Sequence, residues 1–211
     1  MASKTLHSSA LEICQRAMAI LRQENRLTTI APDAPTKVER ACYDAYEATR
    51  LELLSSYGWS FIKADMRVNN GASHYDADGR YRIAYPAVAM KVLKCYDEDG
   101  HKVPFTVRGS QYIYSLRPIH RITYIYDEED ATLYPPLVRD AFVKLLAKNL
   151  CVEVTGRNAD LQMIASLSQQ AIQAAHTDDA RISCTGSETY GRNYLYEVMC
   201  GRRNPFVRKG L

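Results

Sequence analysis

The sequence lacks the short motifs that mark common catalytic and cofactor sites. It contains no G-x-G-x-x-G and no G-x-x-x-x-G-K-[ST] segment, so neither a dinucleotide cradle nor a P-loop is indicated. H-E-x-x-H and G-x-S-x-G are also missing, which removes the signatures of zinc peptidases and of the nucleophile elbow. Five scattered histidines remain, none of them three or four residues from another: His7, His74, His101, His120 and His176. We therefore expect no catalytic residue, no cofactor and no metal site.

Paired cysteines and long apolar runs are missing as well. The six cysteines form no C-x-x-C unit, which argues against both a zinc site and a redox motif. We expect reduced and mostly buried thiols at Cys14, Cys42, Cys95, Cys151, Cys184 and Cys200. No window approaches the ~20 apolar residues of a membrane span, and "MASKTLHSSALEI" has no apolar run of the signal-peptide type. These features favour a soluble protein made in a reducing cytoplasm.

The helical patterns predict four helices, over residues 9–23, 37–57, 136–155 and 158–182. Ser9 with Glu12, and Thr36 with Glu39, match the capping box that opens a helix. Gly58 is expected to end the second helix in a left-handed conformation. The third helix has apolar residues on most of its surface, which predicts that it is largely buried. Its signals are Pro136 at the start and Thr155-Gly156 at the end, and Asn158 is expected to cap the fourth helix.

Residues 59–126 have the alternation and the turns of β-structure. The segments "SFIKADMRV", "AMKVLKCYD", "KVPFTVRG", "QYIYS" and "HRITYIYD" predict one small, mainly antiparallel sheet of four or five strands. Asp99-Gly100 is expected to form a hairpin turn. "NNGASHYDADGR" is expected to be a polar loop. The fold class is therefore α+β, a bundle of about four helices with the sheet inserted between the second and third.

Three polar or aromatic groups have some features of functional sites but are better explained structurally. The carboxylates at 127–130 are expected to lie in a solvated loop rather than to bind a cation. Asp76, Asp78 and Gly79 match only part of a calcium loop, which favours a turn. A tyrosine ladder (Tyr112, Tyr114, Tyr124 and Tyr126) either stacks nucleic-acid bases or covers a sheet face, and the second is favoured because its own segment has no basic surround.

The only tryptophan, Trp59, lies where the second helix gives way to the β-region. An indole buries more area than any other side chain, so Trp59, with Phe61 nearby, is expected to fasten the bundle to the sheet. This is a packing role rather than a chemical one.

The chain is expected to consist of a core, residues 1–184, and an extended C-terminal arm, residues 185–211. The net charge of +3 lies wholly in the arm, because five basic and two acidic residues follow Thr185. Tyrosine and arginine are enriched in protein–protein anchors. The arm is either a disordered basic tail or a segment that becomes ordered on a partner. Its candidate partner-binding residues are Tyr190, Arg192, Tyr194, Tyr196, Arg202, Arg203, Phe206 and Arg208.

One ordered set of features runs from about residue 10 to residue 182. It includes the proline-broken "LTTIAPDAPT", a helix followed by W-x-F, "RYRIAYPAVAMKVLKCYDEDG", and "ITYIYDEEDATLYPPLVRDAFVKLLAKNLCVEVTG". This set resembles the head-to-tail adaptor proteins of short-tailed (podovirus-type) bacteriophages, also called tail tubular protein A. Ile62, where relatives commonly carry alanine, and the long arm depart from the family. The matching positions around W-x-F are Cys42, Tyr43, Asp44, Arg50, Leu54, Trp59 and Phe61.

The resemblance implies a structural virion protein that is not an enzyme and has no cofactor and no small-molecule substrate. Family members form a ring of about twelve copies, bound to the portal on one side and to the tail nozzle, tail tubular protein B, on the other. DNA passes through the channel without sequence-specific binding. The expected location is the virion tail at the head–tail junction, after assembly in the host cytoplasm. Two alternatives remain: a tail-associated cell-wall or polysaccharide hydrolase, and a DNA-binding module that uses the basic arm.

Overall fold

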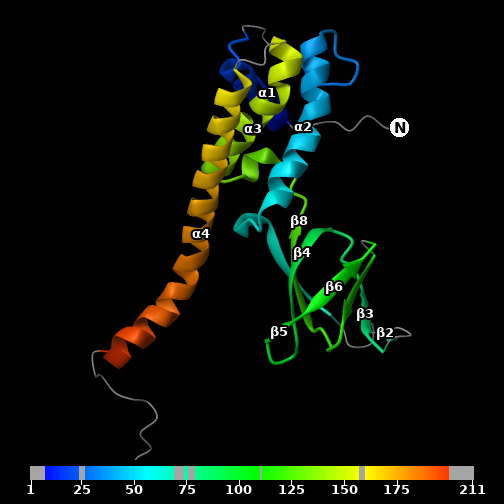
Figure 1. Cartoon of the computed structure of the whole chain (residues 1–211), viewed down its shortest axis with the longest axis vertical. Coiled ribbons are helices and arrows are strands. Elements are labelled where there is room, and N and C mark those ends of the chain that lie inside the picture. Colours follow the sequence, from blue (N-terminus) through cyan, green and yellow to red (C-terminus); the bar gives the residue numbers. More distant parts are fainter. Residues whose placement is uncertain are drawn as a thin grey trace, which may run out of the picture.

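The computed structural model of the chain describes residues 8–23, 27–68, 74–75, 79–109, 111–156 and 160–199, with 184–199 as helical backbone alone. This part of the chain has four α-helices and eight short strands, and all eight strands lie between the second and third helices in sequence. The predicted α+β class is confirmed. Figure 1 shows the helices packed side by side in one part of the molecule and the strands in another.

Helix α1 (Ser8–Ile20) begins one residue earlier than predicted and ends three residues earlier. Ser9 therefore lies inside the helix, where its hydroxyl donates a hydrogen bond to Asp130 Oδ1 at 3.3 Å. The predicted capping box at Ser9 was wrong because the side chain is used for a tertiary contact 121 residues away. Local helix signals do not reveal such a contact.

Helix α2 (Lys37–Ser56) has the predicted capping box. Glu39 N–H donates to Thr36 Oγ1 at 3.2 Å, and the Glu39 carboxylate accepts from Thr36 N–H at 3.3 Å. The predicted left-handed glycine at the other end was wrong, since the helix ends at Tyr57 in an extended conformation. Gly58 instead gives room to Leu93, whose Cδ1 would lie 3.2 Å from an added Cβ.

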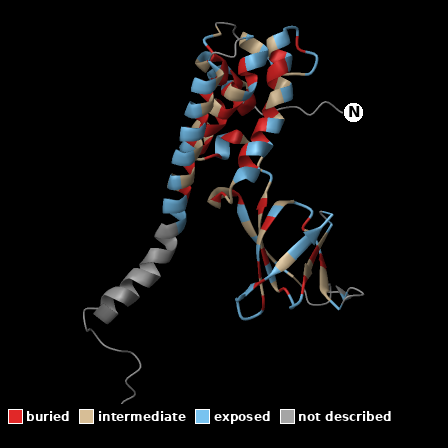
Figure 2. Cartoon of the chain, viewed as in Figure 1, coloured by how far each residue is buried: buried red, intermediate tan, exposed pale blue. Residues whose placement is uncertain are grey.

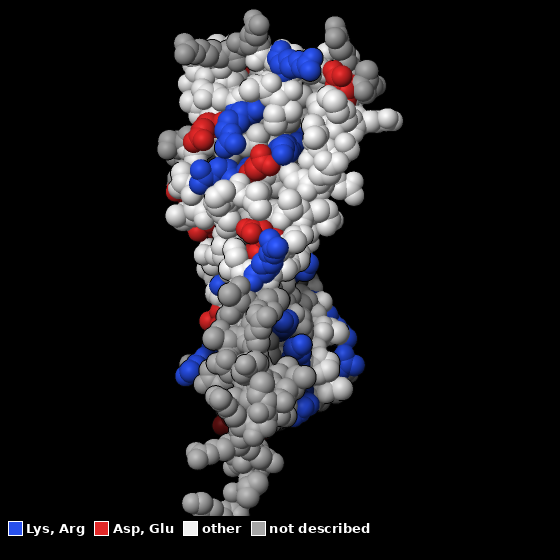
Figure 3. All heavy atoms as spheres, turned by 90° about the vertical axis from the view of Figure 1, so that its left-hand side faces the viewer, with Lys and Arg blue, Asp and Glu red and all other residues white. Residues whose placement is uncertain are grey.

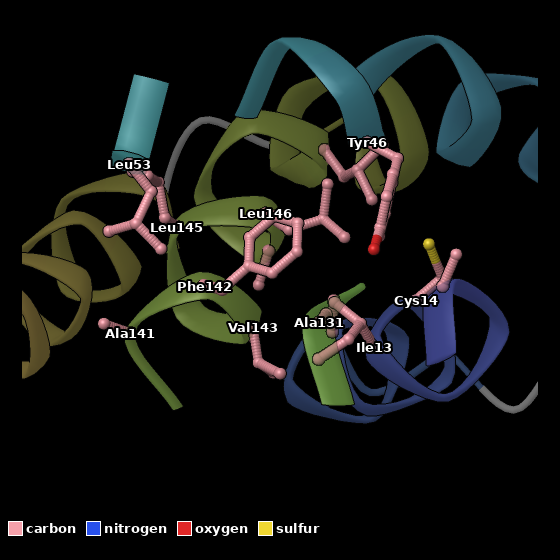
Figure 4. Close-up of a cluster of buried hydrophobic side chains, with 14 of the residues drawn as sticks. Ile13, Cys14, Tyr46, Leu53, Ala131, Ala141, Phe142, Val143, Leu145 and Leu146 are labelled. Atoms are coloured by element: carbon pink, nitrogen blue, oxygen red, sulfur yellow. The ribbon is translucent and has the colours of Figure 1, made fainter. Parts of the chain in front are cut away.

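Helix α3 (Pro136–Thr155) has the predicted bounds and lies against each of the other three helices. Pro136 is in its first turn, and Gly156 ends it with φ of +62°. The prediction that it is largely buried is confirmed. Figure 4 shows Phe142 and Leu146 in the core formed with α1 and α2, with the Tyr46 hydroxyl directed toward α1. The buried residues of α3 are Val138, Ala141, Phe142, Val143, Leu145, Leu146, Ala147, Leu150 and Cys151.

Helix α4 runs from Leu161 to Met199, so the predicted range 158–182 was wrong at its C-terminal end. The helix has 39 residues and is about 58 Å long at 1.5 Å per residue. Gly186 and Gly191 do not end it, because a glycine inside a helix costs only about 1 kcal/mol relative to alanine. Residues 185–199 thus continue α4 instead of forming an extended arm. Asn158, the predicted cap, and residues 200–211 lie outside the described residues.

The strands form two antiparallel sheets of four strands each, where the sequence predicted one sheet. Strand β2 lies inside the segment predicted as a loop. The first sheet has the order β1 (Lys63–Arg67), β8 (Arg121–Tyr126), β4 (Ala89–Tyr96), β5 (Lys102–Val103). The second has the order β2 (His74–Tyr75), β3 (Tyr81–Ala84), β7 (Tyr112–Ser115), β6 (Phe105–Arg108).

Pro104 explains why the single predicted strand "KVPFTVRG" is divided between the two sheets. Proline has no N–H to donate to a ladder, so pairing stops at Val103 and resumes at Phe105 in the other sheet. The Ser115 hydroxyl donates to the Pro104 carbonyl at 3.1 Å and so holds the chain where it passes from one sheet to the other. The predicted hairpin turn at Asp99-Gly100 is confirmed, because Gly100 has φ of +83° between β4 and β5.

The described buried apolar residues form two hydrophobic cores, one among the helices and one between the sheets (Figure 2). Strand β8 contributes to both. Ile122 belongs to the sheet core and Ile125 to the helical core. Because the two residues are three positions apart, they point to opposite faces of the strand. The β-region is therefore packed directly against the bundle.

Reduced, buried thiols are confirmed for the four cysteines whose side chains are described, namely Cys14, Cys42, Cys95 and Cys151. A hydrogen bond with Cys42, together with burial, raises the pKa of the Cys14 thiol. Burial raises the pKa of the Cys95 thiol to about 12. The thiols of Cys14 and Cys95 therefore have little nucleophilic character.

Candidate functional site

The most elaborate group of interactions lies where the helices meet the sheets. We call it the joint: the segment 57–62, which includes the short 3₁₀ helix η1 (Ser60–Ile62), the side chains packed on it, and the contacts of Arg50 with the start of the β8–α3 connection. Trp59 is fully buried there, and its indole N–H donates to the Leu53 carbonyl of α2 at 2.9 Å. The tryptophan is therefore held to the end of α2 by a hydrogen bond as well as by packing.

Aromatic rings surround Trp59 from three parts of the chain. Tyr57 meets the indole edge-on at 5.1 Å between ring centroids, and His176 of α4 lies at 5.0 Å. Tyr57 and His176 also stack on each other at 4.3 Å. Phe61 lies 6.3 Å from the indole and 5.4 Å from Tyr134, in the connection that leads into α3. Trp59 and Phe61, the predicted pair, thus lie in one cluster that links α2, α4 and the β8–α3 connection.

A carboxylate from α4 fixes η1. Asp179 is 4% exposed, and its Oδ1 accepts hydrogen bonds from the Ser60 N–H at 2.9 Å and the Ser60 hydroxyl at 2.5 Å. Burial lowers the pKa of His176, three residues earlier on the helix, although the charge of Asp179 opposes this shift. The imidazole therefore remains neutral at physiological pH and acts as a packing ring.

Arg50 of α2 links this helix to the chain that follows β8. Its side chain is 1% exposed and donates to Glu47 of the same helix at 2.8 and 3.0 Å. It also donates to both carboxylate oxygens of Asp127 and to the Glu128 carbonyl, the last at 2.8 Å. Burial disfavours its charge, but the hydrogen bonds to Asp127 and Glu47 outweigh burial, and the pKa of Arg50 rises.

The acidic run at 127–130 is more than the solvated loop that the sequence predicted. Asp127 holds Arg50, Asp130 caps the short 3₁₀ helix η3 (Ala131–Leu133), and the Glu128 carbonyl accepts from the Tyr134 hydroxyl at 2.7 Å. The loop is therefore a structural part of the joint. The sequence signal for this was weak, because Arg50 and Asp127 are 77 residues apart.

Chemically, the joint is equipped to hold two parts of the chain at a fixed angle. It contains an ion pair whose arginine is buried, stacked rings and hydrogen bonds to backbone, and burial lowers the pKa of its histidine. The hydrogen bond from the Ser60 hydroxyl to Asp179 Oδ1, at 2.5 Å, likewise joins η1 to α4. Positioning is thus the function that this geometry supports.

One further group deserves comparison with a metal site. Asp97, Asp99 and His101 bring potential ligand atoms within 4.8 Å of one another at the β4–β5 turn. Asp97 is already engaged, since its Oδ1 accepts from the His101 N–H at 2.8 Å and its Oδ2 lies 2.9 Å from the Arg117 guanidinium. Arg117 supplies the counter-charge that a cation would supply, so the cluster is explained as a braced hairpin.

None of the described contacts places the predicted partner-binding residues at the joint. Tyr190, Arg192, Tyr194 and Tyr196 fall on the backbone of α4, and their side chains are outside the description. Arg202, Arg203, Phe206 and Arg208 lie outside the described residues altogether. The four tyrosines of the predicted ladder belong to two different sheets, because Tyr112 and Tyr114 are in β7 and the other two are in β8.

In comparisons with known proteins, no protein-family model and no curated protein matches the chain. Among the described helices, none is both long enough and apolar enough to cross a lipid bilayer. The functional inference for this chain therefore depends on its own residues and on the geometry of the joint.

Proposed function

We propose that the chain is a structural virion protein, a ring-forming adaptor that joins the portal to the tail nozzle and continues the DNA exit channel. One observation carries this proposal. Three positions that match the adaptor family lie in the joint: Arg50, Trp59 and Phe61. Asp127 and Tyr134, from the resembling segment that begins "ITYIYDEED", contact Arg50 and Phe61 there. The resembling residues thus include some that hold the helices to the β-region.

The two-part body suits such a role. A closed ring of identical subunits uses two different surfaces of each copy, one for each neighbour. A subunit that also bridges two partners must keep the angle between its parts, and the Arg50–Asp127 ion pair and the buried Trp59 serve that need. The portal is proposed to bind the C-terminal segment, residues 185–211, and the nozzle is proposed to bind the opposite side of the ring. The protein is then a component of the tail at the head–tail junction.

A bridging experiment tests this function directly. Isolated portal rings are incubated with the chain, washed by sedimentation, and then exposed to purified nozzle protein. We expect the portal rings to retain the nozzle protein only after they have been loaded with the chain. Bare portal rings and rings treated with an unrelated protein of similar size are the controls. Equal retention of the nozzle by bare rings, or no retention of the chain, would refute the proposal.

A further inference from the structure

The outer face of the second sheet combines tyrosine and arginine from three strands. Residues directly opposite each other in antiparallel strands share a face, and Tyr114 is opposite both Arg82 and Thr106. The alternate residues, Ile83 and Ile113, are buried in the core between the sheets. The other set therefore points away from the core. We call it the Tyr–Arg face: Arg82, Ala84, Thr106, Arg108, Tyr112 and Tyr114.

Each arginine of this face lies over a tyrosine of the central strand. The Arg82 guanidinium carbon is 4.8 Å from the centroid of Tyr112, and that of Arg108 is 5.2 Å from the centroid of Tyr114. The two tyrosine rings are 6.4 Å apart. Strands β3 and β6 flank β7, so the arginines reach the tyrosines from both sides, across about 10 Å of sheet. The result is a continuous strip of planar groups.

The surroundings of the strip favour an anionic ligand. The four strands of the second sheet contain no aspartate and no glutamate. Residues 59–126 as a whole have ten basic and six acidic side chains. Where Figure 3 leaves the β-region visible, basic side chains predominate, whereas both signs are mixed over the helices. The arginines come from neighbouring strands, which is why the tyrosine segment alone showed no basic surround.

We propose that the Tyr–Arg face binds single-stranded nucleic acid without sequence preference. A guanidinium stacked on a ring keeps its N–H edge for a phosphate, to which arginine donates two parallel hydrogen bonds. Tyrosine rings and the outer faces of the guanidinium groups stack bases of any sequence. Beside Tyr114 lies a hollow of about 200 Å³, also lined by Arg80, Phe105 and Leu116, with the size for one planar base.

A nucleic acid fits this face better than a protein does. Tyrosine and arginine also anchor protein–protein interfaces, but the buried centre of such an interface is otherwise mostly apolar. Ala84 is the only aliphatic residue on the Tyr–Arg face, and two of its six residues are arginines. The inference does not depend on the adaptor function, since it requires only one copy of the chain.

The first sheet provides a matched control. Arg121 lies over Tyr96 at 4.4 Å, the same type of pair as on the Tyr–Arg face. This arginine borders a hollow of about 480 Å³ that is also lined by Asp97, Glu98 and Asp99. Those carboxylates repel phosphate, so this pair is expected to contribute nothing to binding.

The test is fluorescence anisotropy of the full chain with labelled T20 DNA, U20 RNA and a 20-base-pair DNA duplex. We expect either single strand to bind more tightly than the duplex, and the tighter of the two identifies DNA or RNA as the ligand. Changing Tyr112 and Tyr114 together to alanine should weaken binding by at least about tenfold, and changing both to phenylalanine should not. The double change Arg82→Gln, Arg108→Gln should reduce the slope of log K against log salt by about 1.4. Arg121→Gln should leave binding and slope nearly unchanged.

Several results would overturn the proposal. Loss of binding in the double variant Arg202→Gln, Arg203→Gln, with normal binding by the sheet variants, would assign the ligand to the C-terminal segment. No binding at low salt, or a duplex bound as tightly as the single strands, would also reject it. A crosslinking experiment on the unaltered chain tests the proposal even if a variant fails to fold. Ultraviolet crosslinking to a photoreactive single strand should label the peptide with Tyr112 and Tyr114, and labelling only elsewhere would refute the proposal.

Discussion

At the scale of single residues, two buried tyrosines differ in one hydrogen bond. Burial raises the pKa of both Tyr46 and Tyr134, so both hydroxyls remain protonated. The Tyr134 hydroxyl donates to the Glu128 carbonyl at 2.7 Å. The Tyr46 hydroxyl, although buried, has no hydrogen-bond partner among the described residues. A buried polar group without a partner costs free energy that a partnered group does not.

Removing each hydroxyl should therefore have opposite effects on stability. Tyr46→Phe is expected to leave the free energy of unfolding unchanged or to raise it by about 1 kcal/mol. Tyr134→Phe should lower it by about 1 kcal/mol, because the Glu128 carbonyl loses a donor inside the joint. Urea unfolding followed by circular dichroism measures both, and each variant is the control for the other. An equal loss in the two variants would show that Tyr46 has a partner in solution.

At the scale of elements, Arg50 connects α2 to the chain between β8 and α3. Arg50→Met should lower the free energy of unfolding by about 3 kcal/mol, the lower end of the range for a broken buried pair. The lower end applies because Asp127 and Glu47 are each about one-third exposed and regain water. Lys144→Met is the matched control, since its 2.7 Å ion pair with Asp140 is partly exposed and should contribute about 0.5 kcal/mol or less. Equal losses in denaturant unfolding would contradict the account of the joint.

The start of α2 should make the protein sensitive to acid. Hydrogen bonds from Thr36 and Thr28 lower the pKa of Glu39 from 4.5 to about 2. The folded state therefore binds fewer protons than the unfolded state, so the contribution is complete above pH 4.5 and is lost as the pH falls toward about 2. Glu39→Gln should lower the urea midpoint at pH 6 and should flatten its fall below pH 4.5. Glu12→Gln, the same change on the exposed side of α1, should keep the parent's pH dependence. If Glu39→Gln kept the pH profile of the parent, Glu39 would not be the source of the acid sensitivity.

The sequence predicted those element ends that depend on residues close by in the chain. The start of α2 and both ends of α3 were predicted because Thr36, Glu39, Pro136 and Gly156 act within one turn of where they lie. The two-sheet arrangement was missed because it depends on which sheet each side of Pro104 pairs with. The joint was only partly predicted: Trp59 marked its position, but its partners on α4 and after β8 are set by tertiary packing.

At the scale of the whole molecule, the length of α4 separates the body from the C-terminal segment. The last residue of α4 described as buried is Asp179, so a chain ending at residue 184 keeps every described buried position. We expect this truncated chain to melt within a few degrees of the full chain but to lose binding to portal rings. A chain ending at Met199 keeps all of α4 but lacks residues 200–211. Its portal binding therefore tells whether the portal contacts the end of α4 or the residues that follow. Undiminished portal binding by the chain ending at residue 184 would show that the C-terminal segment is not the contact.

The proposed adaptor function is tested most directly by native mass. Mass photometry of isolated portal rings, before and after incubation with the chain, counts the copies that bind. The account predicts that the chain alone is a monomer and that each portal ring gains about twelve chains, because the ring of the adaptor follows the symmetry of the portal. A portal ring whose mass does not change after incubation with excess chain would contradict it.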